Sequence, residues 1–355
     1  MMAAYGTLMR FILSVGILFQ GCDSDVKCRN DAGNVVDWYI LYKLPKGSGD
    51  GLSYLYMDEG TKGWKHSREK INSDTGTLAN TLKPLLDYYA RKTEGFGYML
   101  YNDQPSTGNA PSSFGHSKGV VMLDRQTGVW LSHSAPKFPA DGRTFWPDSA
   151  NNNAQTFMCV TYSYDTFSEI GLQLKYIHAY SFDSDIPTTF HNELRCVAQR
   201  SCYPKKAPWY HVMNLTSMAG KHFLSFAKYT RFGDDLYSGL IVNHLQQNLY
   251  VKSWGKMQRP LPSNCSTAIH HSLYNVKEVQ LLRKPISDTV DHSKWCVTTG
   301  GGWTCIADMN REESQKSRGG GAICTDDVEV GRAFYVMIRK HEECKHKSEV
   351  EHGEL

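Results

Sequence analysis

The tripeptide His-Ser-Lys occurs twice in this 355-residue chain, at His116–Lys118 and at His292–Lys294. The two copies begin 176 positions apart, about half the chain, as expected if two similar halves each contribute one copy to a shared site. In a β-strand, residues i and i+2 point to the same face, so each copy presents an imidazole beside an ammonium. Two such pairs facing each other supply two proton-transfer groups and two fixed cations. Metal-free cleavage of a phosphodiester requires such a set.

Chance remains an alternative for so short a motif. With 14 His in the chain, about one His-x-Lys spacing is expected at random. The identical central Ser, the strand-like flanks and the half-chain separation favour a shared site. Two ordinary exposed strand positions remain the alternative interpretation.

The N-terminal residues are typical of a secretory signal peptide. Arg10 precedes the apolar run 11–19, and polar sequence begins at Gln20. This run is too short to span a bilayer, which takes about 20 apolar residues. We therefore expect residues 1–21 to be a cleaved signal and the mature chain to have no membrane span.

Cysteine usage indicates an oxidising compartment. Of the ten cysteines, Cys22 lies next to the expected cleavage point, and four disulfides with one free thiol would account for the other nine. Short separations favour Cys196–Cys202 and Cys305–Cys324, whereas spacing leaves the remaining pairs open. The chain has no CxxC or HExxH motif to support a zinc site.

Charge depends strongly on pH in this chain. The formal net charge is +3 with neutral His, and protonation of all 14 His would raise it to +17. We therefore expect binding to polyanions to strengthen in an acidic compartment. Two sequons, at Asn214 and Asn264, predict surface glycans if the chain enters the secretory pathway.

Hydrophobic patterns alternate between strand and helix, which predicts an α/β fold. Pro, Lys, Arg and Cys cluster at 183–210, so we divide the mature chain into halves at 22–195 and 196–355. The first half contains a strand–turn–strand unit over 116–133, and 292–308 repeats it in the second half. Other expected strands lie at 35–44, 96–101, 156–164, 222–229, 248–254 and 269–282, and expected helices at 78–92, 234–247 and 327–341.

Several longer segments carry a family resemblance. They are VDWYILYKLP (36–45), GHSKGVVMLD (115–124), WLSHSAPKFP (130–139), FGDDLYSG (232–239), LPSNCS (261–266), DHSKWC (291–296), WTCIADMNR (303–311) and RGGGAIC (318–324). With these segments the chain closely resembles the deoxyribonuclease II family, which is similar in turn to the phospholipase D superfamily. The resemblance implies a phospholipase D-like pseudo-dimer, with two mixed β-sheet halves covered by helices and the active site between them.

The superfamily signature HxKxxxxD is only partly present. Position 123 is Leu, with Asp124 one residue late, and position 299 is Thr. The sequence therefore leaves open what orients the two imidazoles. Asn310, 16 residues after Lys294, does match the superfamily asparagine.

The resemblance also implies an activity and a location. It implies metal-independent endonucleolytic hydrolysis of double-stranded DNA with little sequence preference, leaving 3′-phosphate and 5′-hydroxyl ends. No cofactor is implied. The expected location is the lysosome, reached through the secretory pathway, with some protein secreted; the oligomeric state stays open.

By the same resemblance, His116 is the nucleophile that forms a phosphohistidine and His292 is the general acid, with the reverse assignment still open. Lys118 and Lys294 would neutralise the phosphate, with Asn310 as an uncharged donor. We expect the neighbouring lysines to lower the pKa of both imidazoles, so that the rate is highest at acidic pH.

Further residues are assigned by resemblance or by their position. His133 matches a family position associated with the site, Asp291 and Asp308 could orient site groups or cap turns, and Arg318 with its Gly run could contact phosphate or form a plain turn. The resemblance pairs Cys28 with Cys159 and Cys265 with Cys344, leaving Cys296 free and buried.

Three other functions stay open. Adjacent carboxylates such as Asp234-Asp235 allow a Mg²⁺-dependent nuclease, although neighbouring carboxylates usually point apart. A lumenal phospholipase D-like phosphodiesterase acting on lipid headgroups and a non-catalytic polyanion-binding glycoprotein are the other two.

Overall fold

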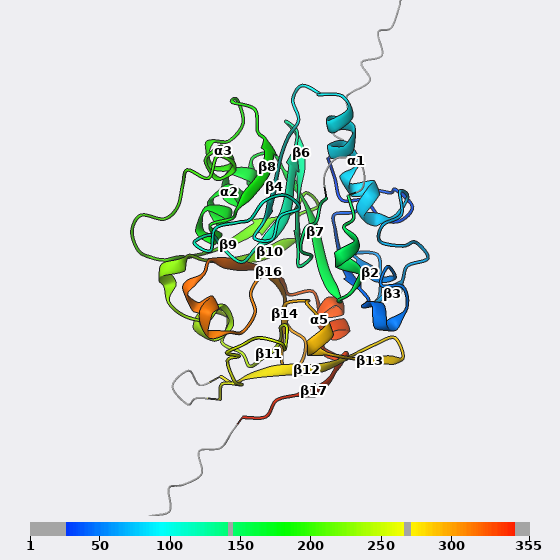
Figure 1. Ribbon diagram of the computed structural model, residues 1–355, viewed down its shortest axis with the longest axis vertical. Helices are drawn as coiled ribbons and strands as arrows, with labels where there is room; N and C mark the ends of the chain where they lie inside the picture. Colours follow the sequence, from blue (N-terminus) through cyan, green and yellow to red (C-terminus); the bar gives the residue numbers. More distant parts are fainter. Residues whose placement is uncertain (1–25, 141–144, 266–270, 345–355) are drawn as a thin grey trace, which may run out of the picture.

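Two β-sheets, each formed by about half of the chain, pack face to face in the computed structural model (Figure 1). The structure describes residues 26–140, 145–265 and 271–344, so the expected signal peptide 1–21 lies outside the described residues. The first sheet is antiparallel throughout. Its strand order is β3 (Lys65–His66), β2 (Tyr54–Asp58), β1 (Trp38–Lys43), β7 (Gln155–Ser163), β6 (Thr127–His133), β5 (Lys118–Leu123), β4 (Gly97–Asn102) and β8 (Ser181–Asp185).

The second sheet repeats this arrangement with later segments of the chain. One parallel pair, β11 with β12, makes it a mixed sheet. Its order is β13 (Lys284–Ser287), β12 (Leu273–Leu281), β11 (Leu249–Lys252), β14 (Trp295–Thr298), β15 (Thr304–Ala307), β16 (Gly320–Thr325), β10 (His222–Lys228) and β9 (Tyr210–Thr216), with β17 (Ile338–His341) paired to β12.

Continuous apolar strands follow from this layering. In β1, Trp38, Ile40 and Tyr42 point into the core between the sheets, while Tyr39 and Leu41 point to the outer face. Helix α1 (Thr77–Ala90) covers that outer face. Both faces of the strand are therefore buried, which is why the sequence shows no polar alternation there.

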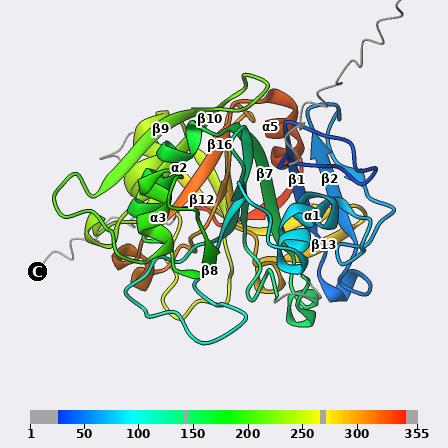
Figure 2. The same cartoon turned by 90° about the horizontal axis from the view of Figure 1, so that it is seen from above.

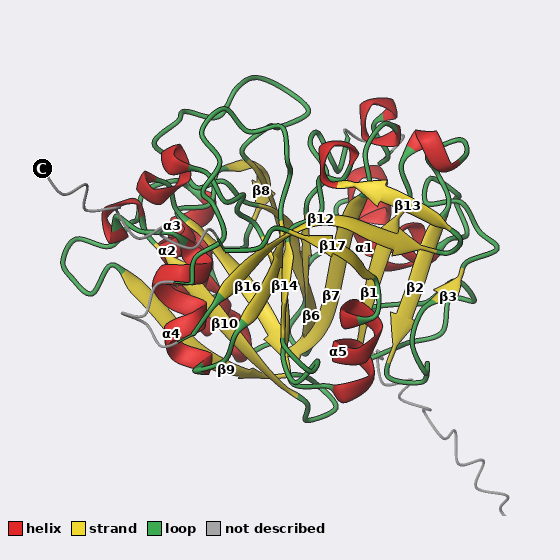
Figure 3. Cartoon of the chain, turned by 90° about the horizontal axis from the view of Figure 1, so that it is seen from below, coloured by secondary structure: helices red, strands yellow, loops and turns green. Residues whose placement is uncertain are grey.

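Helices also flank the core between the sheets. Helix α2 (Thr166–Ile177) packs against β7, β9, β10 and β16, and α5 (Val328–Tyr335) packs against β14 and β15 (Figures 2 and 3). A π-helical turn (Tyr237–Ile241) continues into α4 (Val242–Leu245) and covers the outer face of the second sheet. The result is a two-half α/β fold, as the sequence predicted.

Some elements differ from the sequence expectations. The helix expected over 327–341 ends at Tyr335, and the chain then forms β17, because Ile338–His341 pairs with β12. The sequence missed α2 and the short α3 (Asn192–Ala198). Strand β8 ends at Asp185 and β9 begins at Tyr210, and the division into 22–195 and 196–355 stays a prediction.

Four disulfides join described segments. Cys28–Cys159 ties the N-terminal segment to β7, Cys305–Cys324 links β15 to β16, and Cys196–Cys202 closes the loop after α3. The fourth is Cys265–Cys344, and Cys296 is free and buried on β14. Within the described ranges, no helix has the length and apolar character needed to cross a membrane.

Candidate active site

The two His-Ser-Lys tripeptides lie where the halves meet. The backbone N–H of His116 donates to the carbonyl of Gly319 at 2.8 Å, and that of His292 donates to the carbonyl of Ala154 at 2.9 Å. Each tripeptide is thus held by a backbone bond to the opposite half. The two sheets therefore bring together segments that are half a chain apart.

Equivalent strands carry the two tripeptides. Lys118 is the first residue of β5 and Lys294 immediately precedes β14, and each strand pairs antiparallel with the next one along the chain. The expected repeat of a strand–turn–strand unit is confirmed. Within each tripeptide the His and Lys flank the Ser on the other face of the chain, and both Ser and both Lys are buried.

The His116 ring is oriented by the other half of the molecule. Its Nδ1–H donates to the main-chain carbonyl of Asp308 at 2.8 Å. In the neutral ring this bond leaves Nε2 with the free lone pair. Nε2 lies 3.9 Å from a carboxylate oxygen of Asp103.

Asp103 is a site residue that the sequence did not reveal. Its carboxylate accepts a hydrogen bond from the Lys118 ammonium and lies 3.5 Å from the Arg318 guanidinium. Burial raises the pKa of Asp103, but His116, Lys118 and Arg318 outweigh burial and hold that pKa well below its usual range. The one local signal was its position directly after β4, the strand that pairs with β5.

The second tripeptide is supported by different partners. The His292 ring packs against the Trp254 indole, with centroids 4.4 Å apart. The Trp254 backbone N–H donates to the side-chain oxygen of Asn310 at 3.1 Å, so Asn310 lies next to Trp254. Lys294 is buried, with 4% of its surface exposed.

Asp291 stabilises the backbone next to His292, and its side-chain partners among the described residues include no imidazole. It accepts hydrogen bonds from the Tyr42 hydroxyl at 2.6 Å and from the backbone N–H of Ser293 at 2.9 Å. The Lys252 ammonium lies 3.4 Å from the same carboxylate, and both side chains are fully buried. This buried ion pair fixes the start of the second tripeptide.

Burial lowers the pKa of both imidazoles. For His116 and for His292 the pKa falls to about 3, first because burial disfavours the charged ring. Asp103 raises the pKa of His116 but does not outweigh burial, and lysines from both halves lower the pKa of both rings further. Burial and the Lys118 charge likewise lower the pKa of Lys294 to about 7. Because each imidazole senses the lysine of the opposite half, the four side chains lie in one electrostatic environment.

Asp308 and Arg318 both lie beside His116. The Asp308 carboxylate accepts a hydrogen bond from the Gly321 N–H at 3.0 Å, and burial raises its pKa to about 7. Arg318 donates to the carbonyls of Phe114 at 3.1 Å and Gly115 at 3.2 Å, and it faces Asp103. Arg318, which lies in the second half, therefore bonds to the backbone directly before His116.

His133 lies deeper, at the end of β6. Its ring packs against Phe138 and Phe157, and its Nδ1 accepts a hydrogen bond from the Ala135 N–H at 3.2 Å. Burial, followed by the charge of Lys118, holds its pKa well below the usual range. Among the described residues no hydrogen-bond partner reaches its buried Nε2.

A pocket of about 540 Å³ opens beside His292. The Gln155 amide in its wall is held by the Ser134 hydroxyl at 2.6 Å. The remaining wall includes two prolines, the charged side chains of Asp103 and Lys137, and amide or hydroxyl side chains from Gln104, Ser106, Asn109, Ser149 and Asn153. The pocket is therefore suited to a polar group next to the His292 imidazole.

The other expected sites are located as follows. Asn214 is exposed on β9, and the main chain of Asn264 pairs with Leu273. Across the described ranges, no group of three or more His, Cys, Asp or Glu side chains is arranged to hold a metal ion.

Fold and site together define a two-half α/β protein with one paired His-Lys site at the junction of its halves. The sequence profile of the family described as Deoxyribonuclease II matches residues 27–344. Deoxyribonuclease-2-alpha of Mus musculus is 37% identical over 355 residues, covering 95% of this chain and 98% of the relative.

Two further relatives cover most of the chain. Plancitoxin-1 of Acanthaster planci is 37% identical over 341 residues, covering 91% of this chain and 94% of the relative. Deoxyribonuclease-2-beta of Mus musculus is 38% identical over 335 residues, covering 90% and 93% respectively. This chain belongs to the deoxyribonuclease II family, which confirms the resemblance found in the sequence.

Proposed function

We propose that this protein is an acid endonuclease that cleaves DNA through a phosphohistidine on His116, leaving 3′-phosphate and 5′-hydroxyl ends. Membership of the deoxyribonuclease II family makes the chain a phosphodiester hydrolase. One observation carries the mechanism: the backbone N–H of each tripeptide histidine is hydrogen-bonded to the opposite half, which brings both tripeptides to one junction.

In the first step, the Nε2 lone pair of His116 attacks phosphorus. The new P–N bond forms as the P–O5′ bond breaks, and His292 gives its proton to the departing 5′-oxygen. The hydrogen bond from Nδ1 to the carbonyl of Asp308 supports this assignment, because it leaves Nε2 free to attack.

In the second step, neutral His292 takes a proton from a water molecule. The hydroxide oxygen attacks phosphorus, the P–N bond breaks, and the 3′-phosphate leaves while His116 regains its lone pair. His292 is then protonated again for the next cycle. No redox partner is needed, since bonds and protons balance over the two steps.

The lysines stabilise charge that gathers on the non-bridging oxygens. Lys118 and Lys294 are both nearly buried, so their charges act through a medium less screened than water. Asn310, held near the site by its bond to the Trp254 N–H, is the proposed uncharged donor. The phosphate in turn offsets the repulsion between the two ammonium groups.

Acidic pH suits both parts of this mechanism. His292 must carry a proton, and its low pKa of about 3 makes that proton scarce near neutrality. Phosphate binding brings negative charge and raises this pKa. Lys294, with a pKa of about 7, loses its charge as pH rises above neutrality, so phosphate binding weakens there.

Substrate and location follow from the same proposal. Contacts from lysines to phosphate carry little base information, so we expect double-stranded DNA to be cut with little sequence preference. Disulfides, the expected signal peptide and the sequon at Asn214 support entry into the secretory pathway. An acid-dependent nuclease made there suits the lysosome, with a secreted fraction.

Nicking of supercoiled plasmid at acidic pH in excess EDTA tests the proposal. Wild-type protein should nick the plasmid and leave 3′-phosphate ends, whereas His116→Ala and His292→Ala should not. His66→Ala, on the exposed strand β3, is the matched control and should retain activity. Cleavage that needs added Mg²⁺, or products with 5′-phosphate ends, would rule out this mechanism.

A further inference from the structure

A row of aromatic rings leads away from the active site on the His116 side. Phe114 stacks on the His178 ring with centroids 4.3 Å apart. His178 contacts Tyr203 and Tyr229 edge-on, at 5.9 and 5.5 Å. The two tyrosine rings are almost parallel, with planes 7° apart. These four side chains are called the aromatic row below.

The row begins next to the catalytic groups. Phe114 lies two residues before His116, and its carbonyl accepts the hydrogen bond from the Arg318 guanidinium. The same guanidinium faces Asp103, the partner of Lys118. Phe114 and Arg318 therefore connect the aromatic row to the groups around His116.

Four exposed cations border the aromatic row. Arg200 lies over the Tyr180 ring at 5.2 Å and Arg231 over the Trp209 ring at 5.0 Å, while Lys205 and Lys206 lie on the loop 199–209 between them. None of the four forms an ion pair within the described part of the chain. Their charge is therefore available to an anionic ligand.

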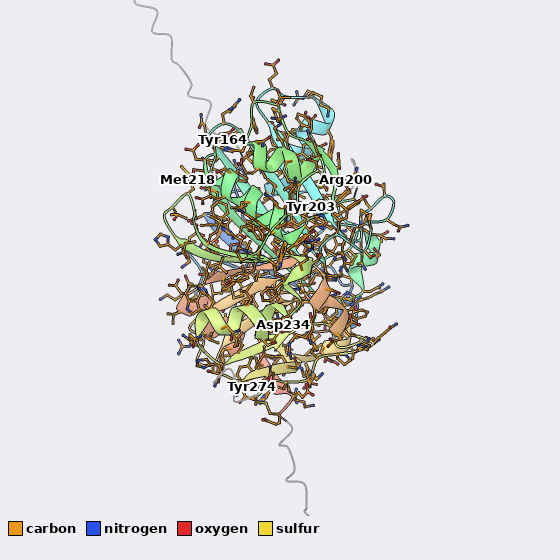
Figure 4. All side chains as sticks on the ribbon, turned by 90° about the vertical axis from the view of Figure 1, so that its left-hand side faces the viewer. Tyr164, Arg200, Tyr203, Met218, Asp234 and Tyr274 are labelled. Atoms are coloured by element: carbon orange, nitrogen blue, oxygen red, sulfur yellow. A yellow bond between two sulfur atoms is a disulfide. The ribbon has the colours of Figure 1, made fainter. Side chains whose placement is uncertain are left out.

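The outermost ring is open to solvent. Tyr203 is 46% exposed, whereas Tyr229 beneath it is 8% exposed. The disulfide Cys196–Cys202 holds the loop that carries Tyr203 and Arg200, and Figure 4 shows these two side chains near each other on one face. Ordinary packing accounts for Tyr229 but not for an exposed ring on a loop that also carries Arg200, Lys205 and Lys206.

Exposed rings interleaved with cations are the combination that binds nucleic-acid strands, since phosphates meet the cations and bases stack on the rings. We propose that the aromatic row and its four cations form a second DNA-binding subsite, which holds the strand entering the active site on the His116 side. The four cations contact backbone phosphates, and Tyr203 stacks on an unpaired base. This inference rests on the proposed function, because it takes DNA as the substrate.

Equilibrium binding of fluorescent DNA tests the subsite without chemistry. The binding protein is the His116→Ala variant, alone or with R200Q, K205Q and K206Q together. Each phosphate contact contributes about 0.9 to the slope of log affinity against log salt on duplex DNA. The triple change should therefore lower the slope by about 2 to 3 and weaken binding at least tenfold at low salt.

A matched control removes the same charge elsewhere. The triple change K62Q, K65Q and R68Q lies around β3, on the other side of the first half, and should leave the slope unchanged (Figure 1). Tyr203→Ala should weaken binding of single-stranded DNA about fivefold or more, while Tyr203→Phe should not, because a phenyl ring also stacks. Equal effects of the two triple changes would overturn the proposal.

Turnover separates this subsite from the catalytic centre. In otherwise wild-type protein, R200Q with K205Q and K206Q should raise the KM for plasmid and leave turnover of bis(4-nitrophenyl) phosphate unchanged. Loss of turnover on both substrates would refute a separate subsite. Normal salt-dependent binding by a wild-type protein that cuts no DNA would refute the nuclease function and leave the subsite standing.

Discussion

Replacing His292 with Ala separates acid catalysis from substrate binding. The 5′-oxygen of DNA leaves as an alcohol, and an alkoxide is a poor leaving group because its conjugate acid is about as weak as water, with a pKa of about 15.7. A 4-nitrophenolate leaves readily without a proton. His292→Ala should therefore slow DNA cleavage and largely spare thymidine 3′-(4-nitrophenyl) phosphate.

The structure sets the size of the effect. A general acid contributes about 10²- to 10⁴-fold, or about 2.7 to 5.4 kcal/mol of barrier. With a pKa of about 3, only about one free molecule in a hundred carries the His292 proton at about pH 5. Wild-type kcat/KM on DNA should then rise about tenfold per unit as pH falls toward that pKa.

Steady-state kinetics on both substrates measure this contrast. His292→Ala should lose the rise at acidic pH on DNA and keep near wild-type turnover of the 4-nitrophenyl ester. His116→Ala should lose turnover of both substrates, because no leaving group replaces a nucleophile. Equal losses of turnover on both substrates for His292→Ala would refute its role as the acid. If His116→Ala slowed only DNA cleavage while His292→Ala abolished turnover of both substrates, the roles of the two histidines would be exchanged.

Three further predictions concern the charges that support the site. Asp103 raises the pKa of Lys294, so Asp103→Asn should move the alkaline limb of kcat/KM to lower pH; an unmoved limb would contradict this. Asp291→Ala leaves Lys252 buried without its partner and should cost about 3 to 5 kcal/mol of unfolding free energy by calorimetry. As a control, Asp87→Ala removes the exposed Lys83–Asp87 ion pair and should cost under about 1 kcal/mol of unfolding free energy. A similar loss for Asp87→Ala and Asp291→Ala would contradict burial as the cause. Folding raises the pKa of Asp308 to about 7. The protonated carboxyl therefore stabilises the native state at pH values below its unfolded pKa, and this stabilisation is lost as pH rises through 7. Wild-type protein should therefore gain stability relative to Asp308→Asn as pH falls from about 7 to about 4, and a difference constant with pH would contradict this.

Sequence reasoning recovered what local patterns encode. The paired tripeptides and their strand–turn–strand units could be predicted, because period-2 spacing and turn residues are local signals. Helix α2 was missed although Phe167, Ile170 and Leu174 have helical spacing, since polar residues separate them between longer strand-like runs. Strand β17 was missed because its pairing with β12 is a tertiary contact.

Asp103 and the Asp308 carbonyl were beyond sequence reasoning for a different reason. Asp103 is defined by its contacts with His116, Lys118 and Arg318, and Arg318 lies 215 residues away in the chain. A main-chain carbonyl has no residue signature at all. Only the packing of the two sheets shows that Asp308 contributes its backbone as well as its side chain to the site.

The main-chain carbonyl of Asp308 orients the His116 ring, although the carboxylate of the HxKxxxxD signature is missing from position 123. A carboxylate bonded to Nδ1 would raise the pKa of His116, because an opposite charge favours the protonated ring. A protonated ring has no free lone pair on nitrogen, so a His116 held in that way could not act as the proposed nucleophile in acid. A neutral carbonyl fixes the ring without that cost, and the charge of Asp103 is shared with Lys118 and Arg318. The His116 ring is therefore fixed by a neutral group that leaves Nε2 without a proton, and burial opposes protonation of that nitrogen.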